Sequence, residues 1–154
     1  MGKHTYPPMD HLLSHRPPMI LLDRLLTSTD TESTCEVTIG SWSLFLEPSG
    51  IPSYVGIEYM AQAIAAHGGY KSYQAGEPIE LGFLLGTSRW HSWCRFFEIG
   101  QTLHIYVRHI WGDHQFMRFY CTITDALTMT LLQEGDVNVL KPKEALSYLQ
   151  RGRS

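Results

Sequence analysis

The chain has 154 residues, of which 44% belong to the apolar and aromatic set and 18% are charged. This length fits one domain, and the composition is too apolar for a disordered chain. Twelve Lys and Arg against fifteen Asp and Glu give a net charge of −3, which disfavours a nucleic-acid-binding protein.

Targeting and membrane signals are weak. The longest aliphatic run covers residues 19–22, far short of the ~20 residues of a membrane span. The first eight residues hold no apolar signal region, and Tyr6 stands where a myristoylation signal has Ser or Thr. The three cysteines are odd in number, which fits a reducing compartment. We therefore expect a cytoplasmic protein without a membrane span.

No residue pattern predicts a metal site. The cysteines Cys35, Cys94 and Cys121 lack the spacing of metal ligands. His104, His109 and His114 follow at five-residue intervals, which fits neither one strand face nor a zinc-binding helix pair.

Short elements are predicted before residue 52. Residues 9–13 can form one or two helical turns. The apolar run 19–26 fits a helix or a strand, because periodicity alone does not separate them. Residues 27–34 are polar and indicate a turn, whereas 35–39 alternate as a strand does. Prolines and a glycine within 41–52 indicate a loop.

One long helix is predicted over about residues 54–73. Its interior holds Ala and Gly on several faces, so that other backbone can approach closely. We expect this helix to be enclosed by a sheet rather than to lie on a surface. Ser53 is a candidate N-cap, and Gly76 closes the segment.

The following half of the chain is β-like. Strands are predicted over 81–86, 89–97, 103–111, 115–125, 128–133 and 137–140, with the last two separated by a turn at Gly135. Residues 143–150 suggest a short terminal helix. The order predicts an α+β fold in a single domain, 1–154, with a bent antiparallel sheet of five or more strands around one helix.

A carboxylate lies in the second turn of the apolar helix. Glu58 and Gln62 are four residues apart and therefore share a face. Burial raises a carboxyl pKa, whereas a helix N-terminus lowers it, so Glu58 is a candidate general acid or base. The alternative is a surface carboxylate, or one held by a structural Arg.

Two motifs resemble those of a known enzyme family. Leu-Leu-Ser-His-Arg-Pro-Pro and the residues after it, 12–24, resemble the N-terminal signature of FabZ-type 3-hydroxyacyl-acyl carrier protein dehydratases. Residues 52–62, which end in Glu-Tyr-Met-Ala-Gln, resemble their central helix. Together with 81–87, this form is similar to the ApeP branch, the dehydratase-like subunit of aryl-polyene pigment clusters. The resemblance spans about 9–140.

The resemblance implies a hotdog fold that works as a dimer, and dehydration of a 3-hydroxyacyl thioester to the trans-2-enoyl thioester. The acyl chain would be carried on the phosphopantetheine of an acyl carrier protein, with no other cofactor. In the family a His removes the α-proton, and a Glu from the neighbouring subunit protonates the leaving hydroxyl. Carried over by motif, Glu58 is the acid, and Ser53, Tyr54 and Gln62 take oxyanion and substrate-binding roles.

The family's catalytic His is missing from its usual place. Its His-Phe-Pro-Gly motif begins fourteen residues before the Glu, where this chain has Leu44. No His lies between His15 and His67, and His67 falls on the helix face opposite Glu58. The base is then either His15 or a His from a partner subunit.

Three functions remain open at this stage. The first is a dehydratase active alone, and the second is a non-autonomous subunit of a hetero-oligomeric dehydratase. The third is a hotdog acyl thioesterase, in which a carboxylate activates water. The arginines Arg89, Arg95, Arg108 and Arg118 predict either a docking patch for an acidic carrier protein or solvated strand faces.

Overall fold

The structure is a computed structural model that describes residues 5–113 and 115–141. Its elements in chain order are η1 Met9–His11, β1 Arg24–Ser28, β2 Glu32–Thr38, β3 Ile51–Pro52, η2 Ser53–Val55, α1 Gly56–Ala75, β4 Phe83–Ser92, β5 Phe96–Phe97, β6 Thr102–Gly112, β7 Phe116–Asp125 and β8 Leu131–Leu140. The terminal helix expected over 143–150 lies outside the described residues. In the described part of the chain, no helix has the length and hydropathy needed to cross a membrane.

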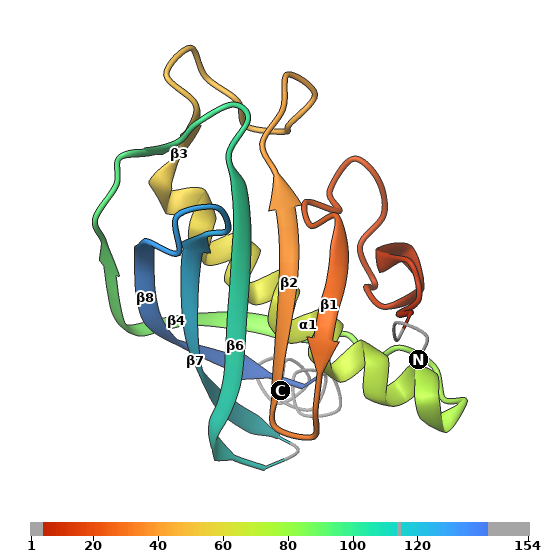
Figure 1. Ribbon diagram of the computed structural model, residues 1–154. Coiled ribbons are helices and arrows are strands. Elements are labelled where there is room, and N and C mark those ends of the chain that lie inside the picture. The colour runs from red at the N-terminus through yellow and green to blue at the C-terminus, as the bar shows by residue number, and fades with distance from the viewer. Residues whose placement is uncertain (1–4, 114, 142–154) are drawn as a thin grey trace, which may run out of the picture.

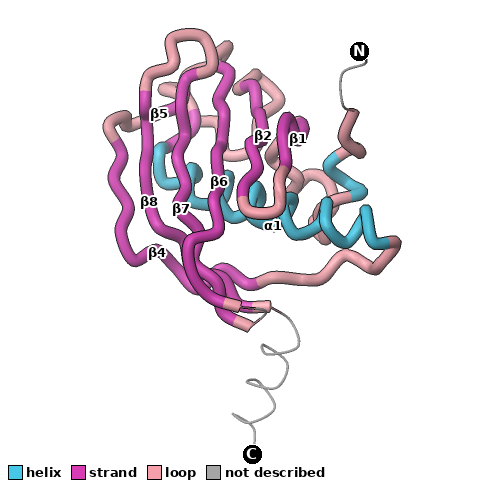
Figure 2. The backbone as a smooth tube through the Cα atoms, turned by 60° about the horizontal axis from the view of Figure 1, so that its bottom comes forward, coloured by secondary structure: helices cyan, strands magenta, loops and turns pink. Residues whose placement is uncertain are grey.

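Six strands form one antiparallel sheet in the order β1-β2-β6-β7-β8-β4. Figure 1 and Figure 2 show α1 lying along one face of this curved sheet. β3 and β5 form a separate two-stranded sheet at the start of the helix. The predicted α+β arrangement of one long helix and a bent antiparallel sheet is confirmed.

The core lies between α1 and the inward side chains of the sheet. Leu103, Ile105 and Val107 alternate with outward residues along β6, and all three are fully buried. Buried positions of α1 occur on several faces, among them Met60 and Ala66. Enclosure of the helix, predicted from its Ala and Gly content, is therefore confirmed.

The two ends of α1 differ in their capping. Gly76 ends it with a φ of 67°, the left-handed conformation for which glycine is suited. Ser53 is not the N-cap that its position suggests: it opens η2, and α1 begins at Gly56 with no side-chain cap on Val55. The backbone N–H of Ser53 instead donates to the carbonyl of Arg95, 2.9 Å away. The pairing of β3 with β5, rather than a side-chain cap, therefore positions the start of the helix.

Several strand boundaries also differ from the prediction, and β4, Phe83–Ser92, joins the two strands predicted over 81–86 and 89–97. The polar segment 27–34 is mostly strand, since β1 reaches Ser28 and β2 begins at Glu32. The turn predicted at Gly135 is absent, and β8 passes straight through this residue. A Cβ at Gly135 would lie 2.8 Å from the carbonyl oxygen of Arg89 on β4. The glycine marks a close approach of two strands rather than a turn.

Glycines 68 and 69 offer a test of how tightly the N-terminal segment packs on α1. A Cβ at Gly69 would lie 1.9 Å from the carbonyl oxygen of Leu12, whereas one at Gly68 meets nothing within 4 Å. Gly69→Ala should therefore lower the free energy of unfolding by about 1–3 kcal/mol, measured by urea denaturation. Gly68→Ala is the matched control and should raise it by up to about 1 kcal/mol through helix propensity. Equal effects at both positions would contradict this packing.

Candidate active site

The segment between η1 and β1 contacts α1 at two positions along the helix axis. Near the C-terminal half of the helix, the Leu12 backbone lies against Gly69. Nearer its start, the Gln62 carboxamide accepts a hydrogen bond from the Leu21 N–H at 2.9 Å and donates one to the Met19 carbonyl at 2.7 Å. These attachments hold the residues between them beside the first turns of α1.

His15 lies in this fastened segment and faces Glu58. Its Nε2 is 3.8 Å from Glu58 Oε1, and the two side chains are 31% and 36% exposed. Its Nδ1 is buried and has no hydrogen-bond partner among the described residues. Arg16 donates to the His15 carbonyl at 2.9 Å. The structure thus brings together two of the predicted site residues that are 43 positions apart, with one imidazole nitrogen directed at the carboxylate.

Gln62 lies beside the Glu58 carboxylate and contacts it. Its side chain is fully buried, and its Nε2 lies 3.4 Å from Glu58 Oε1 in addition to its backbone contacts. The predicted sharing of a helix face with Glu58 is correct. The substrate-binding role stays a prediction; in this structure the carboxamide is fully buried and bonded to the backbone of residues 19 and 21.

The predicted oxyanion donor, the backbone N–H of Ser53, is already bonded within the chain. The Ser53 N–H is already donated to Arg95, and the Ser53 carbonyl accepts from Gln133 Nε2 at 2.7 Å. The amides of Tyr54 and Val55 follow in the first turn, where a helix has no acceptors of its own. The Tyr54 side chain is 65% exposed beside them.

A cavity of about 730 Å³ begins at His15 and Glu58 and follows α1. One wall is a stripe of small helix residues, Ala61, Ala65 and Gly68. Figure 2 shows the chain after α1 turning back along the helix before it enters β4. That returning chain and the inward side chains of the sheet form the other wall, with Phe83, Leu84, Met117, Phe119 and Val139. The mostly apolar lining suits an acyl chain.

The loop that carries the His in related dehydratases has no proton acceptor at that position. Leu44 is a half-buried apolar residue in an irregular loop. Phe45, 46% exposed, has a φ of 70°, a left-handed conformation that is rare for a bulky side chain. This chain by itself therefore has no base at the family position.

The cysteine thiols are poor nucleophiles. Burial raises the pKa of Cys35 to about 12, and it also raises the pKa of Cys94 and of Cys121. All three are unpaired thiols that stay protonated near neutral pH. Among the residues with described positions, no group of three or more His, Cys, Asp or Glu is arranged to hold a metal ion.

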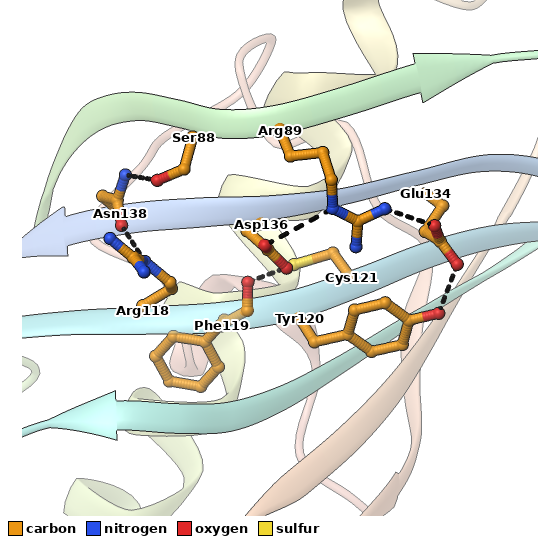
Figure 3. Close-up of polar contacts among 9 residues, drawn as sticks. All are labelled: Ser88, Arg89, Arg118, Phe119, Tyr120, Cys121, Glu134, Asp136 and Asn138. Carbon is orange, nitrogen blue, oxygen red and sulfur yellow. Dashed lines mark hydrogen bonds and ion pairs between the residues drawn. The ribbon is translucent and has the colours of Figure 1, made fainter.

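Two of these arginines, Arg89 and Arg118, make polar contacts with side chains of the neighbouring strand on the outer face of the sheet, shown in Figure 3. Arg89 contacts Glu134 at 2.6 Å and Asp136 at 3.6 Å. Arg118 donates to Asn138 at 2.9 Å. These contacts favour the interpretation as solvated strand faces over a docking patch at both positions.

His67, the buried histidine of α1, makes stability depend on pH. Burial is the main cause that lowers its pKa from 6.5 to about 4; the charges of Lys71 and His109 act in the same direction, and a hydrogen bond to the Asp30 backbone opposes them. Between pH 6.5 and about pH 4, the His67 imidazole is therefore protonated in the unfolded chain but neutral in the folded chain. The free energy of unfolding should fall by up to about 3 kcal/mol between pH 6.5 and pH 4.

Urea titrations at stepped pH measure this slope. His67→Gln should lose most of it, while the control His104→Gln, on the outer face of the sheet, should leave the His67 contribution in place. An unchanged slope in His67→Gln would show that other groups carry the acid sensitivity.

The fold and the helix carboxylate together define a hotdog protein of the dehydratase type. The family model for ApeP-like proteins, described as ApeP dehydratase, matches residues 7–150, so the chain belongs to that family and is a dehydratase. The dehydratase heterocomplex ApeI:P from Xenorhabdus doucetiae is similar with a TM-score of 0.86 and 30% identity, covering 94% of this chain and 99% of that one. The predicted hotdog fold is confirmed.

More distant structures share the fold alone. A hypothetical thioesterase from Streptococcus pneumoniae has a TM-score of 0.61 at 9% identity, covering 77% of this chain and 84% of that one. An HP0420 homologue from Helicobacter felis has a TM-score of 0.62 at 14% identity, covering 85% and 98%. No curated protein matches the sequence. The thioesterase alternative is not favoured, because it rests on fold similarity only.

Proposed function

We propose that this chain supplies the acid half of a site that dehydrates 3-hydroxyacyl thioesters, and that a partner subunit supplies the base. The observation that carries the proposal is that Glu58, in the first turn of α1, lines an acyl-sized cavity. The base removes the proton on C2, and that electron pair forms the C2–C3 double bond. The hydroxyl leaves C3 with the Glu58 proton as water, while the amides of Tyr54 and Val55 hold the thioester oxygen.

His15 then acts on Glu58 rather than on the substrate. Its Nδ1 is buried, so Nε2 is the nitrogen that can exchange protons, and Nε2 faces the carboxylate at 3.8 Å. In this arrangement His15 orients the Glu58 carboxylate. The alternative is that His15 turns from Glu58 to the substrate and serves as the base itself.

A second hotdog subunit is the partner that the sheet can accommodate. β4 is an edge strand, and an unpaired edge invites a further strand. Large apolar side chains lie exposed on and before it, at Leu81, Phe83, Leu84 and Leu85. The similar structure from Xenorhabdus doucetiae is itself a heterocomplex of two proteins, ApeI and ApeP. This favours a heterodimer or a larger assembly over a lone chain.

The substrate is proposed to arrive on the phosphopantetheine arm of an acyl carrier protein in the cytoplasm, as in aryl-polyene biosynthesis. Arg95 is the arginine best placed to contact such an acidic partner. It is exposed, its carbonyl binds the Ser53 N–H at the helix start, and it has no ion pair within the described residues. No cofactor other than the carrier's own arm is needed for this elimination.

The test is to offer the purified chain and its partner three carrier-bound thioesters: 3-hydroxyacyl, trans-2-enoyl and saturated. Mass spectrometry should show loss of water from the first and gain of water by the second. The saturated thioester should stay intact. Release of free thiol from all three, without gain or loss of water on the chain, would overturn the proposal in favour of hydrolysis.

A further inference from the structure

A glutamine occupies a core position of β8. Gln133 is fully buried and faces the core in step with Val137 and Val139 of the same strand. A polar side chain is rarely buried without hydrogen-bond partners, because removing it from water costs free energy. The carboxamide nitrogen of Gln133 has two such partners. It donates to the Ser53 carbonyl at 2.7 Å and to Ser92 Oγ at 3.1 Å.

These partners connect β8 with the turn that precedes α1. The Ser53 N–H donates to the Arg95 carbonyl at 2.9 Å, so both backbone groups of Ser53 are bonded to distant parts of the chain. Ser92 Oγ donates to the Cys94 carbonyl at 2.7 Å, which leaves its lone pairs to accept from Gln133. The network therefore links η2 to β8 and to the end of β4.

The other side of the carboxamide lies against the first residue of α1. A Cβ added at Gly56 would overlap Gln133 Oε1, so only glycine leaves room for the carboxamide here. The Oε1 atom is buried and has no hydrogen-bond partner among the described residues, which is costly. An apolar side chain of similar size would avoid this cost. The favourable contribution of the glutamine therefore lies in its nitrogen and in the Ser53 carbonyl that it binds.

We propose that Gln133 is a positioning residue for the dehydration: it fixes η2, and thereby sets where the Glu58 carboxylate lies relative to the leaving hydroxyl. The inference rests on the proposed function, because it assigns a further residue to the same reaction. Glu58 is the third residue of α1, so a shift of the turn before the helix moves its carboxylate as well. The amides of Tyr54 and Val55, which the proposed mechanism assigns to the thioester oxygen, belong to η2 itself.

The start of α1 depends on such a contact because it has no side-chain cap of its own on Val55. Displacement of a reacting group by about 1 Å can cost about 10²-fold in rate. Gln133 does not line the cavity, so its replacement leaves the walls that bind the acyl chain in place. Loss of the Gln133 donor should therefore act on turnover more than on substrate binding.

The experiment replaces Gln133 with Met, which has a similar size and lacks the donor. In the active assembly, Gln133→Met should lower kcat for hydration of a carrier-bound enoyl thioester by about tenfold or more, with KM changed by less than about twofold. Gln101→Met is the matched control, because Gln101 is half-buried, lies outside the cavity wall and donates to Asp125 at 2.8 Å. It should lower the melting temperature and leave kcat unchanged.

A milder variant covers the case in which Gln133→Met does not fold. Ser92→Ala removes one of the two acceptors of the Gln133 nitrogen and leaves the Ser53 carbonyl in place. It should lower kcat by a smaller factor at the same KM. Rates of all variants are compared at a temperature where their melts show folded protein.

Hydrogen exchange separates this inference from the proposed function. In Gln133→Met, amide exchange at residues 56–60 should rise by about tenfold or more relative to residues 62–70 of the same helix. If the wild-type assembly dehydrates nothing but exchange still rises at 56–60, Gln133 holds the helix start and the proposed reaction is wrong. An unchanged kcat in the folded Gln133 and Ser92 variants would overturn the inference. So would an equal loss of kcat in Gln101→Met, or a loss of kcat without faster exchange at 56–60.

Discussion

Glu58→Gln is expected to lower the dehydration rate of the active assembly by about 10²-fold or more. The carboxamide cannot give up a proton to the leaving hydroxyl, so C–O cleavage loses its acid. The substitution should leave the fold intact, because Glu58 is 36% exposed and an amide oxygen can still accept the weak contact from Gln62. The measurement is the initial rate of hydration of a carrier-bound enoyl thioester, beside a thermal melt of the same sample.

The matched control is Asp10→Asn, the same change of carboxyl to carboxamide at an exposed residue of η1 that does not line the cavity. It should retain the wild-type rate. If Glu58→Gln retains that rate too, Glu58 is not the acid. If its melting temperature drops sharply, the rate is compared at a temperature where both variants are folded.

The sequence predicts the elements well wherever one face of an element is buried. The alternation of Leu103, Ile105 and Val107 gives β6 almost to its ends, and the small residues of 54–73 give an enclosed helix. The errors fall where a distant partner decides the local structure. Ser53 fits an N-cap by local rules, but its amide is paired with Arg95, 42 positions later. Gly135 fits a turn, but it lets β4 approach closely.

The sequence predicts only the part of the site whose residues lie close together on one element. Glu58 and Gln62 share a helix face at a fixed spacing, so their proximity follows from the sequence. His15 lies near Glu58 because hydrogen bonds from the Gln62 side chain to the backbone of Met19 and Leu21 keep its segment beside the helix. No local sequence pattern predicts these long-range hydrogen bonds. The cavity was not predictable either, since it forms where the chain after the helix folds back along it.

The approach of His67 and His109 around Phe119 joins three elements, α1, β6 and β7. Sequence reasoning treated these histidines only as an unsuitable metal set and as a helix residue facing away from Glu58. The signal available for His109 was its inward register on β6, in step with the buried Leu103, Ile105 and Val107. A polar residue at a core position of a strand is the pattern that would have marked it.

The purified chain alone is expected to be a weak dehydratase or an inactive one, and a hotdog partner that carries the His should raise the rate by about 10²–10⁴-fold. In a homodimer of the kind that the family resemblance implies, Glu58 would face Leu44 in place of the catalytic His, and a leucine side chain cannot accept a proton. The measurement is hydration of a carrier-bound enoyl thioester by the chain alone, by the partner alone and by their mixture. Full activity of the lone wild-type chain would refute the half-site.

His15→Ala decides which of the two roles His15 plays. If His15 orients Glu58, the variant mixed with its partner should keep a measurable rate that is lower than that of the wild-type mixture. If His15 is the base, the lone wild-type chain is active and His15→Ala abolishes that activity by itself. The control is His11→Ala, an exposed residue in η1 that contacts Asp10 rather than Glu58 and should leave the rate unchanged. A mixture of the wild-type chain with a partner that lacks its own His should be inactive, because the α-proton then has no acceptor on either subunit.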